Sequence, residues 1–359
     1  RPRAAMDTRR KITPWRRLHA DPVNLRLEPT LLSGGTYRWR RLPETGTYVG
    51  VVGDAVVELR EDPAGCDFRV RNADAGRDAA AVEAPLRTFL GLHRGVDLRT
   101  HWEPLSRYPP RFREAFAAVG QGSRCPHLDR LEAIVCFVGS ANNTIVRNTA
   151  MVLALCAAFP ASELLRDETG AHFAFPTAAQ LGTLSEADLR ALGWGYRAAR
   201  VAALPGALEA LGGDAFLDAV GALDDAAARA ALCQLPGVGP KVADCALLTG
   251  WARDSIVPVD THVRAIAERH LGARTKGKSL SPQVYEEVVA CYRRAFGAEY
   301  AGCAFGPMFT AELHGFKDRL RSPAPALVET GGAPSPQGKG AGPALFDTPG
   351  LRPGPKRVR

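Results

Sequence analysis

The chain has 359 residues and a mass of 38.4 kDa, enough for a large hydrophobic core and more than one compact unit. Its formal net charge is +8 and its sequence pI is about 9.2, which fits a polyanionic partner without requiring one. No apolar run approaches the ~20 residues of a membrane span, and the eight cysteines include no C-x-x-C pair, so we expect no membrane association, zinc ribbon or cysteine-ligated iron–sulfur cluster.

The first part of the chain predicts a basic arm followed by an antiparallel sheet. Residues 1–19 carry seven Lys or Arg and one acidic residue, a composition typical of a flexible basic arm. Further along, residues 47–52 and 55–59 are rich in β-branched side chains and flank Gly53-Asp54, which is typical of a hairpin. We therefore predict an N-terminal antiparallel β-sheet domain over residues 20–120.

Beyond residue 120 the apolar spacing becomes helical. Gly, Pro and capping residues separate the apolar segments, as expected for a series of amphipathic helices. One predicted helix lies within residues 124–138, and the others span residues 145–159, 186–193, 198–211, 225–234, 241–251, 261–271, 282–296 and about 302–317. Pro and Gly dominate from residue 322, so the tail 322–359 is expected to be disordered. The sequence thus predicts an α+β fold, with a two-part helical domain over residues 121–321.

The most specific pattern in the chain lies in residues 225–260. Two predicted helices flank Pro236-Gly237-Val238-Gly239, which indicates a helix–hairpin–helix motif over residues 225–251. Glycine allows the tight turn, and the unpaired N–H groups at the start of the second helix form an anion site. Such a hairpin can hold a DNA phosphate without reading a base. Lys241 follows the turn, and Asp260 comes later in the sequence Val-Pro-Val-Asp.

Lys241 and Asp260 each have a simpler explanation when taken alone. Many helix–hairpin–helix modules only grip phosphate, and Lys241 could serve that role. An aspartate directly before an apolar helix, such as Asp260, is an ordinary N-cap. The combination is more informative, because an amine and a carboxylate beside a phosphate site suggest covalent chemistry at a nucleic-acid sugar.

With these motifs, residues 24–316 resemble the 8-oxoguanine DNA glycosylase family of the helix–hairpin–helix glycosylase superfamily. The resemblance implies that Lys241 attacks C1′ of a flipped nucleotide, expels the base and forms a Schiff base. It implies that Asp260 stabilises charge at the sugar and assists proton movement. Once C1′ is an iminium, the C2′ proton becomes acidic and the 3′-phosphate can leave by β-elimination. The implied enzyme is therefore a bifunctional DNA glycosylase and AP lyase that excises 8-oxoguanine opposite cytosine in base excision repair.

The resemblance also implies a pocket for the base. The carbonyl of Gly34 attracts the N7–H of 8-oxoguanine and repels the N7 lone pair of guanine, while Cys245 and Phe309 pack against the extruded base. Phe305 stands where the family usually has a glutamine that hydrogen-bonds the Watson–Crick edge, and Phe lacks an amide's donor and acceptor. Gly35 also stands where a larger polar residue is usual. Core packing is the simpler explanation for Cys245 and Phe309, and these departures leave the choice of oxidised purine open.

A second group of residues is implied to contact DNA. Asn142 and Arg147 would hydrogen-bond the orphaned cytosine, Tyr196 would fill the emptied stack, and Arg197 would add a second cytosine contact. Base flipping costs a few kcal/mol, part of which an aromatic wedge recovers. His262 matches a residue near the 5′-phosphate. Three of these residues also have a simpler structural explanation. Asn142 could form a turn or cap, Tyr196 could pack a loop, and His262 could be a solvent-facing residue at the start of a helix.

The implied partner is double-stranded DNA containing an oxidised purine, bound by a monomer. No redox or organic cofactor is implied, no side chains suggest a metal site, and an ion between the hairpin carbonyls and a phosphate stays open. Two alternatives stay open: a glycosylase for another oxidised or alkylated base, and a non-catalytic DNA-damage binding protein whose hairpin only anchors phosphate. The basic residues 355–359 favour the nucleus, with the mitochondrion or another organelle as alternatives. A solvated basic tail is the simpler explanation of those residues.

Overall fold

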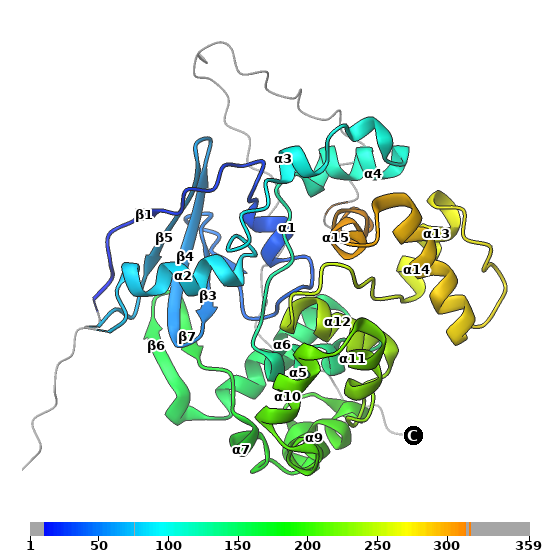
Figure 1. Cartoon of the computed structure of the whole chain (residues 1–359). Coiled ribbons are helices and arrows are strands. Elements are labelled where there is room, and N and C mark those ends of the chain that lie inside the picture. The colour runs from blue at the N-terminus through cyan, green and yellow to red at the C-terminus, as the bar shows by residue number, and fades with distance from the viewer. Residues whose placement is uncertain (1–10, 75, 314–315, 317–359) are drawn as a thin grey trace, which may run out of the picture.

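The computed structural model describes residues 11–74, 76–313 and 316 (Figure 1). The first ten residues of the predicted arm and the whole predicted tail 322–359 lie outside these described residues. Within the described residues, an N-terminal antiparallel sheet precedes a large helical region, which confirms the predicted α+β fold. None of the described helices combines the length and apolar character needed to cross a membrane.

The N-terminal sheet has five strands in the order β1-β5-β4-β3-β2, all antiparallel. The strands are β1 (Arg16–Arg17), β2 (Arg40–Arg41), β3 (Tyr48–Val52), β4 (Ala55–Asp62) and β5 (Gly65–Val70). The predicted hairpin is confirmed, because Val52 pairs with Ala55 across the Gly53-Asp54 turn. Runs of Val and aromatic residues suit these strands, which are packed on both faces.

The prediction of a flexible arm is wrong for the part of residues 1–19 that the structure describes. β1 pairs with β5, and Leu18 is fully buried. The basic side chains do not prevent this pairing, since Arg17 forms ion pairs with Asp62 at 2.8 Å and Asp67 at 2.9 Å. Composition indicated only the charge of this segment, whereas the open edge of β5 decided its structure.

Each face of the sheet is covered by a different element. Helix α2 (Ala79–Phe89) lies on one face, and the hairpin of β6 (Glu163–Asp167) and β7 (Gly170–Phe173) lies on the other (Figure 1). On the α2 side, Trp39 crosses β3 at Gly50, where a β-carbon would come within 2.2 Å of the indole ring. The sequence analysis did not predict the β6–β7 hairpin.

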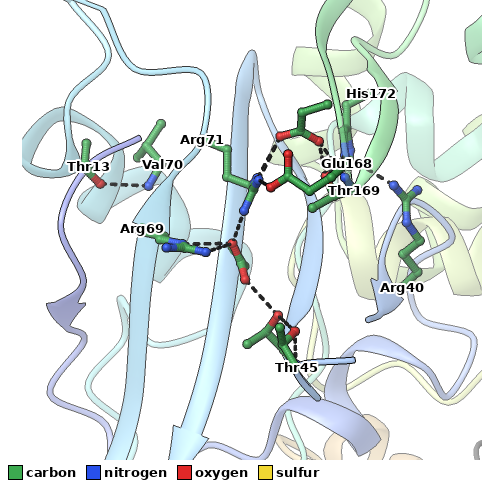
Figure 2. A network of polar contacts seen from close by, with 12 residues as sticks. Thr13, Arg40, Thr45, Arg69, Val70, Arg71, Glu168, Thr169 and His172 are labelled. Atoms are coloured by element: carbon green, nitrogen blue, oxygen red, sulfur yellow. Dashed lines mark hydrogen bonds and ion pairs between the residues drawn. The ribbon is translucent and has the colours of Figure 1, made fainter. Parts of the chain in front are cut away.

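A polar network joins that hairpin to the sheet (Figure 2). Arg71, which is 2% exposed, donates to Glu58 of β4 at 2.5 Å and also pairs with Asp167 at 2.9 Å and with Glu168. On the same hairpin, His172 Nε2 lies 2.9 Å from the Thr169 hydroxyl and 3.3 Å from Arg40 Nη2. Charged groups therefore hold the two strand units together where few apolar residues are available.

The helices form two groups with separate hydrophobic cores (Figure 1). The first group shares its core with the sheet and contains α5 (Arg130–Ser140), α6 (Ile145–Ala157), α7 (Ala178–Leu181), α8 (Glu186–Ala191), α9 (Ala198–Leu211), α10 (Asp214–Ala222), α11 (Asp225–Leu232) and α12 (Pro240–Gly250). The second contains α3 (Leu98–His101), α4 (Pro110–Ala115), α13 (Thr261–His270), α14 (Pro282–Phe296) and α15 (Ala301–Thr310). Short additional elements are α1 (Leu27–Leu31) and the turns η1 (Leu105–Arg107), η2 (Phe116–Gly120), η3 (Pro160–Ser162) and η4 (Gly195–Arg197).

The second helical group corrects the predicted domain boundary at residue 120. Leu98, Trp102, Phe112 and Phe116 belong to the core built by α13–α15 rather than to the sheet. The ring of Phe112 lies 4.9 Å from that of Phe296 on α14. Burial of these large side chains against distant helices carries the α3–α4 segment across the molecule, an outcome that local sequence does not reveal.

Candidate active site

The predicted catalytic and base-binding residues line one cavity of about 680 Å³. The cavity lies between the two hydrophobic cores, with contributions from the loop between α1 and β2, from α12 and from α15. The predicted residues that line it are Gly34, Lys241, Cys245, Asp260, His262, Phe305 and Phe309. Residues that are up to 275 positions apart in sequence (34 and 309) are thus brought to one concave site.

The helix–hairpin–helix motif is confirmed as α11, a tight turn and α12. Gly237 has φ +80°, a left-handed conformation that favours glycine. Val238 is 5% exposed and its N–H donates to the carbonyl of Leu235 at 3.1 Å, which fixes the turn. Gly239 is the N-cap of α12 without a side chain to cap it, and Pro240 occupies the first turn. The N–H groups of the first turn therefore stay available for an anion.

Lys241 lies at the start of α12 with its amine turned toward α5. Its Nζ donates to the hydroxyl of Ser140 at 3.4 Å and lies 5.8 Å from the centre of the Phe137 ring. None of the ion pairs found in the described part of the chain involves Lys241. A half-buried amine at a cavity wall, held by a weak hydroxyl contact, is free to meet an electrophile that enters the cavity.

Asp260 combines the two explanations that the sequence offered. Its Oδ1 accepts from the N–H groups of His262 and Val263, each at 2.9 Å, so it is the N-cap of α13. The same carboxylate lines the cavity with Lys241. Capping fixes the orientation of the carboxylate, and the cavity gives it access to a ligand.

Cys245 is 7% exposed, one turn beyond Lys241 on α12. Burial raises the pKa of its thiol to about 11, and the positive charge of Lys241 opposes this rise. The thiol is therefore neutral at physiological pH and offers a small, polarizable surface to the cavity.

Aromatic side chains of α15 form the opposite wall. The rings of Phe305 and Phe309 lie 5.3 Å apart and are tilted by 37°, and the imidazole of His262 meets Phe309 edge-on at 6.3 Å. Helix α15 runs unbroken through Pro307. A β-carbon on Gly306 would meet nothing within 4 Å, so this wall leaves open space beside Phe305.

The three residues predicted to contact the orphaned cytosine also meet the predicted wedge Tyr196, next to the part of α5 and α6 that lines the cavity. The carbonyl of Ala141 accepts from the Tyr196 hydroxyl at 2.9 Å and from Arg197 Nε at 3.1 Å, while Arg197 Nη2 donates to the carbonyl of Asn142 at 2.9 Å. Asn142 has φ +48°, as turn-forming asparagines can. The exposed side chain of Arg147 approaches the loop that carries Tyr196, since its Nη2 lies 3.8 Å from where a β-carbon on Gly195 would be.

Comparison with known proteins agrees with this geometry. Residues 17–134 match the family described as "8-oxoguanine DNA glycosylase, N-terminal domain", and residues 135–291 match "HhH-GPD superfamily base excision DNA repair protein". The N-glycosylase/DNA lyase OGG1 of Arabidopsis thaliana is 36% identical over 315 residues, which cover 86% of this chain and 83% of that protein. The chain belongs to the 8-oxoguanine DNA glycosylase family.

Solved structures confirm the fold of this family member. The Clostridium acetobutylicum 8-oxoguanine glycosylase/lyase, in complex with duplex DNA containing cytosine opposite 8-oxoguanine, is similar with a TM-score of 0.68 at 24% identity. MBOgg1, in complex with a low-affinity DNA ligand, is similar with a TM-score of 0.67 at 25% identity. Each likeness covers 80% of this chain and 91% of the other.

Within this glycosylase, Arg197 has a structural role that sequence reasoning missed. Its side chain is only 1% exposed, and its guanidinium donates to two main-chain carbonyls of the Ala141-Asn142 turn. Arg197 therefore holds the loop that carries Asn142, and its contact with a cytosine stays a prediction. A single sequence gives no signal for this, because both roles need the same planar set of donors.

Arg200 of α9 is a further residue that the sequence did not single out. The guanidinium lies 5.7 Å from the centre of the Tyr196 ring, and a β-carbon on Gly237 would come within 2.7 Å of Arg200 Cδ. Arg200 is exposed, and none of the ion pairs among the described residues includes it. It places an unpaired positive charge between the hairpin and the Tyr196 loop.

Proposed function

We propose that this protein removes 8-oxoguanine opposite cytosine from duplex DNA, and then cleaves the strand, through a Schiff base on Lys241. The observation that carries the proposal is that Lys241 and Asp260 line one cavity, directly beyond a hairpin whose N–H groups can hold a phosphate. Membership of a family of N-glycosylase/DNA lyases supports the overall reaction.

The chemistry follows from the groups at the cavity. The deprotonated amine of Lys241 attacks C1′ of the flipped nucleotide, and the electron pair of the glycosidic bond leaves with the base nitrogen, which takes up a proton. Positive character develops at the sugar as that bond breaks, and the carboxylate of Asp260 offsets it. The bond between C1′ and the ring oxygen then breaks: the oxygen keeps the electron pair and takes up a proton, while the nitrogen lone pair forms the iminium. Loss of a C2′ proton expels the 3′-phosphate, which is the lyase step.

The rest of the site would hold the distorted duplex. Backbone N–H groups at Gly239 and the first turn of α12 face an anion, and the half-exposed ring of Tyr196 can enter the stack that the flipped base vacates. Asn142 follows Ala141, whose carbonyl accepts from the Tyr196 hydroxyl, and Arg147 of α6 approaches Gly195 next to Tyr196. We infer that these two side chains meet the cytosine left behind.

A panel of duplexes carrying different lesions, each opposite each of the four bases, tests this function. The proposal expects the fastest excision for 8-oxoguanine opposite cytosine, followed by strand cleavage. Preferred release of an oxidised pyrimidine or an alkylated purine would favour another glycosylase of the superfamily. Salt-sensitive binding without any excision would favour a non-catalytic damage-binding protein.

Asp260→Asn separates the catalytic role from the capping role. Asparagine is as good an N-cap as aspartate, so the variant should keep α13 and bind DNA while excising the base at least tenfold more slowly. Circular dichroism and single-turnover excision measure the two effects. Excision at the wild-type rate in Asp260→Asn would remove Asp260 from the mechanism.

A further inference from the structure

The amine and the carboxylate of the site belong to different halves of the molecule. Lys241 lies on α12, whose residues Val242 and Cys245 pack in the core shared with the sheet, whereas Val259 and Val263 around Asp260 pack in the second core. Boundaries between separately packed units are the places where relative motion is easiest. The distance between the Lys241 amine and the Asp260 carboxylate therefore depends on the contacts that cross the boundary between the two cores.

A buried carboxylate on α12 provides such a crossing. Asp244 is completely buried in an otherwise apolar stretch of the helix, and its two oxygens have different partners. Arg229 Nε of α11 donates to Oδ1 at 2.6 Å, and the hydroxyl of Tyr285 on α14 donates to Oδ2 at 2.5 Å. The guanidinium of Arg229 also lies 5.3 Å from the centre of the Tyr285 ring. A buried charge is tolerated only with such partners.

The chain of hydrogen bonds ends next to Asp260. The Tyr285 oxygen accepts from the backbone N–H of Val259 at 3.1 Å. Val259 is fully buried in a loop without regular structure, so its N–H would otherwise have no acceptor. A tyrosine hydroxyl can donate once and accept at the same time, and here one atom does both.

We propose that Asp244 and Tyr285 are positioning residues that hold the backbone of the Asp260 loop at a fixed place relative to the Lys241 helix. The inference rests on the proposed function, because it assigns both residues a task in base excision. They touch no substrate themselves and act through the placement of Asp260. Loss of the link would let the carboxylate shift by a fraction of an ångström or more, and catalysis is sensitive to shifts of this size.

Tyr285→Phe is the test, because it keeps the ring and removes only the hydroxyl, whereas removal of Asp244 would also take away the acceptor of Arg229 Nε. Single-turnover excision with saturating protein should slow ten- to hundredfold on the duplex that wild type cuts fastest. DNA affinity should change less than about twofold, and circular dichroism should be unchanged. Tyr108→Phe is the control in the second core, since the Tyr108 ring stacks on Phe296 of α14 with 5.8 Å between ring centres and no hydrogen bond of its hydroxyl is found among the described residues; it should excise at the wild-type rate.

The decisive comparison repeats Tyr285→Phe in the Asp260→Asn protein. If Tyr285 acts through Asp260, the second change should alter the already reduced rate less than about twofold. An equal loss in both backgrounds, an unchanged rate in Tyr285→Phe, or the same loss in Tyr108→Phe would each overturn the inference. An unaffected rate in Asp260→Asn alone would remove Asp260 from the mechanism and the inference with it, whereas a wild-type protein that does not excise 8-oxoguanine would refute the proposed function.

Discussion

The carboxylate of Asp260 both caps helix α13 and lines the cavity. Oδ1 of Asp260 is engaged by two N–H groups of α13, and the side chain still faces the space that Lys241 lines. The cap orients the carboxylate before any ligand arrives, which reduces the reorganisation needed during the reaction. Structural and functional explanations of one residue can thus both hold.

Phe305 is the residue with the clearest consequence for substrate choice. Its ring, tilted against that of Phe309, offers apolar surface in a cavity that also contains the open space beside Gly306. Phe305→Gln adds a donor and an acceptor on that wall. If this position reads the base, the variant should release 8-oxoguanine about tenfold faster, with smaller changes for other lesions.

The same duplex panel measures this effect. Phe309→Leu, on the same wall, is a control for changes in packing alone and should slow release of all bases that stack there. No gain for 8-oxoguanine in Phe305→Gln would show that another group reads the Watson–Crick edge.

Among the elements, strongly patterned helices could be predicted and short irregular pieces could not. α9 and α14 have the predicted bounds: the left-handed Gly212 ends α9, and α14 combines helical apolar spacing with a Ser281 cap. Within the predicted segment 124–138, α5 begins only at Arg130, since Asp129 caps it and Pro126 disfavours helix for the residue before it. The β6–β7 hairpin and α10 were missed, because charged and small residues there obscure their periodicity.

The candidate site could be predicted as a set of residues but not as an arrangement. The motif around the hairpin identified Lys241 and Asp260, and the structure places both at one cavity. The partners that hold them, Ser140, Asp244 and Tyr285, carry no local signal. Their roles arise only when α5, α12 and α14 pack together.

The contact between α9 and the hairpin, made by Arg200, leads to a prediction about DNA affinity. Arg200 adds an unpaired guanidinium beside Gly237 and Tyr196, so Arg200→Ala should weaken binding to any duplex several-fold. The slope of log affinity against log salt should fall by about one, as expected for one lost phosphate contact.

Fluorescence anisotropy over a salt series measures this slope. Arg274→Ala is a suitable control, because Arg274 is also exposed but follows the C-terminal end of α13, away from the capped start near Asp260. A slope in Arg200→Ala equal to that of wild type would exclude the phosphate contact.

For the whole molecule, polar links between units matter as much as the two cores. Arg38 before β2 donates to Glu132 of α5 at 2.8 and 2.6 Å, with both side chains buried, and the network of Figure 2 ties the β6–β7 hairpin to the sheet. Removal of one partner from such a buried pair costs far more than the pair contributes over an apolar substitute. These links make the assembly sensitive to protonation.

His172 gives that sensitivity a pH window. Burial, together with the charge of Arg40, lowers the pKa of His172 from 6.5 to about 4. Arg40 can only donate, so Nε2 must accept and the folded ring is neutral. A lowered folded pKa means that this stability is present above pH 6.5 and is lost as pH falls toward 4. At pH 5 the loss attributable to His172 should be about 2 kcal/mol.

Urea unfolding at pH 7 and pH 5 tests this contribution. In His172→Gln the amide oxygen can still accept from Arg40, so the fall in unfolding free energy between the two pH values should be about 2 kcal/mol smaller than in wild type. An equal fall in both proteins would show that His172 does not titrate in this window.

Covalent trapping is the most direct test of the central claim, that the amine of Lys241 bonds to the sugar at a damaged site. Borohydride added to the protein and an 8-oxoguanine:cytosine duplex should reduce the Schiff base, and mass spectrometry should place the sugar adduct on Lys241. Lys241→Gln should give no adduct, while still binding the duplex through the hairpin. An adduct at wild-type level in Lys241→Gln, or one mapped to another residue, would contradict the account.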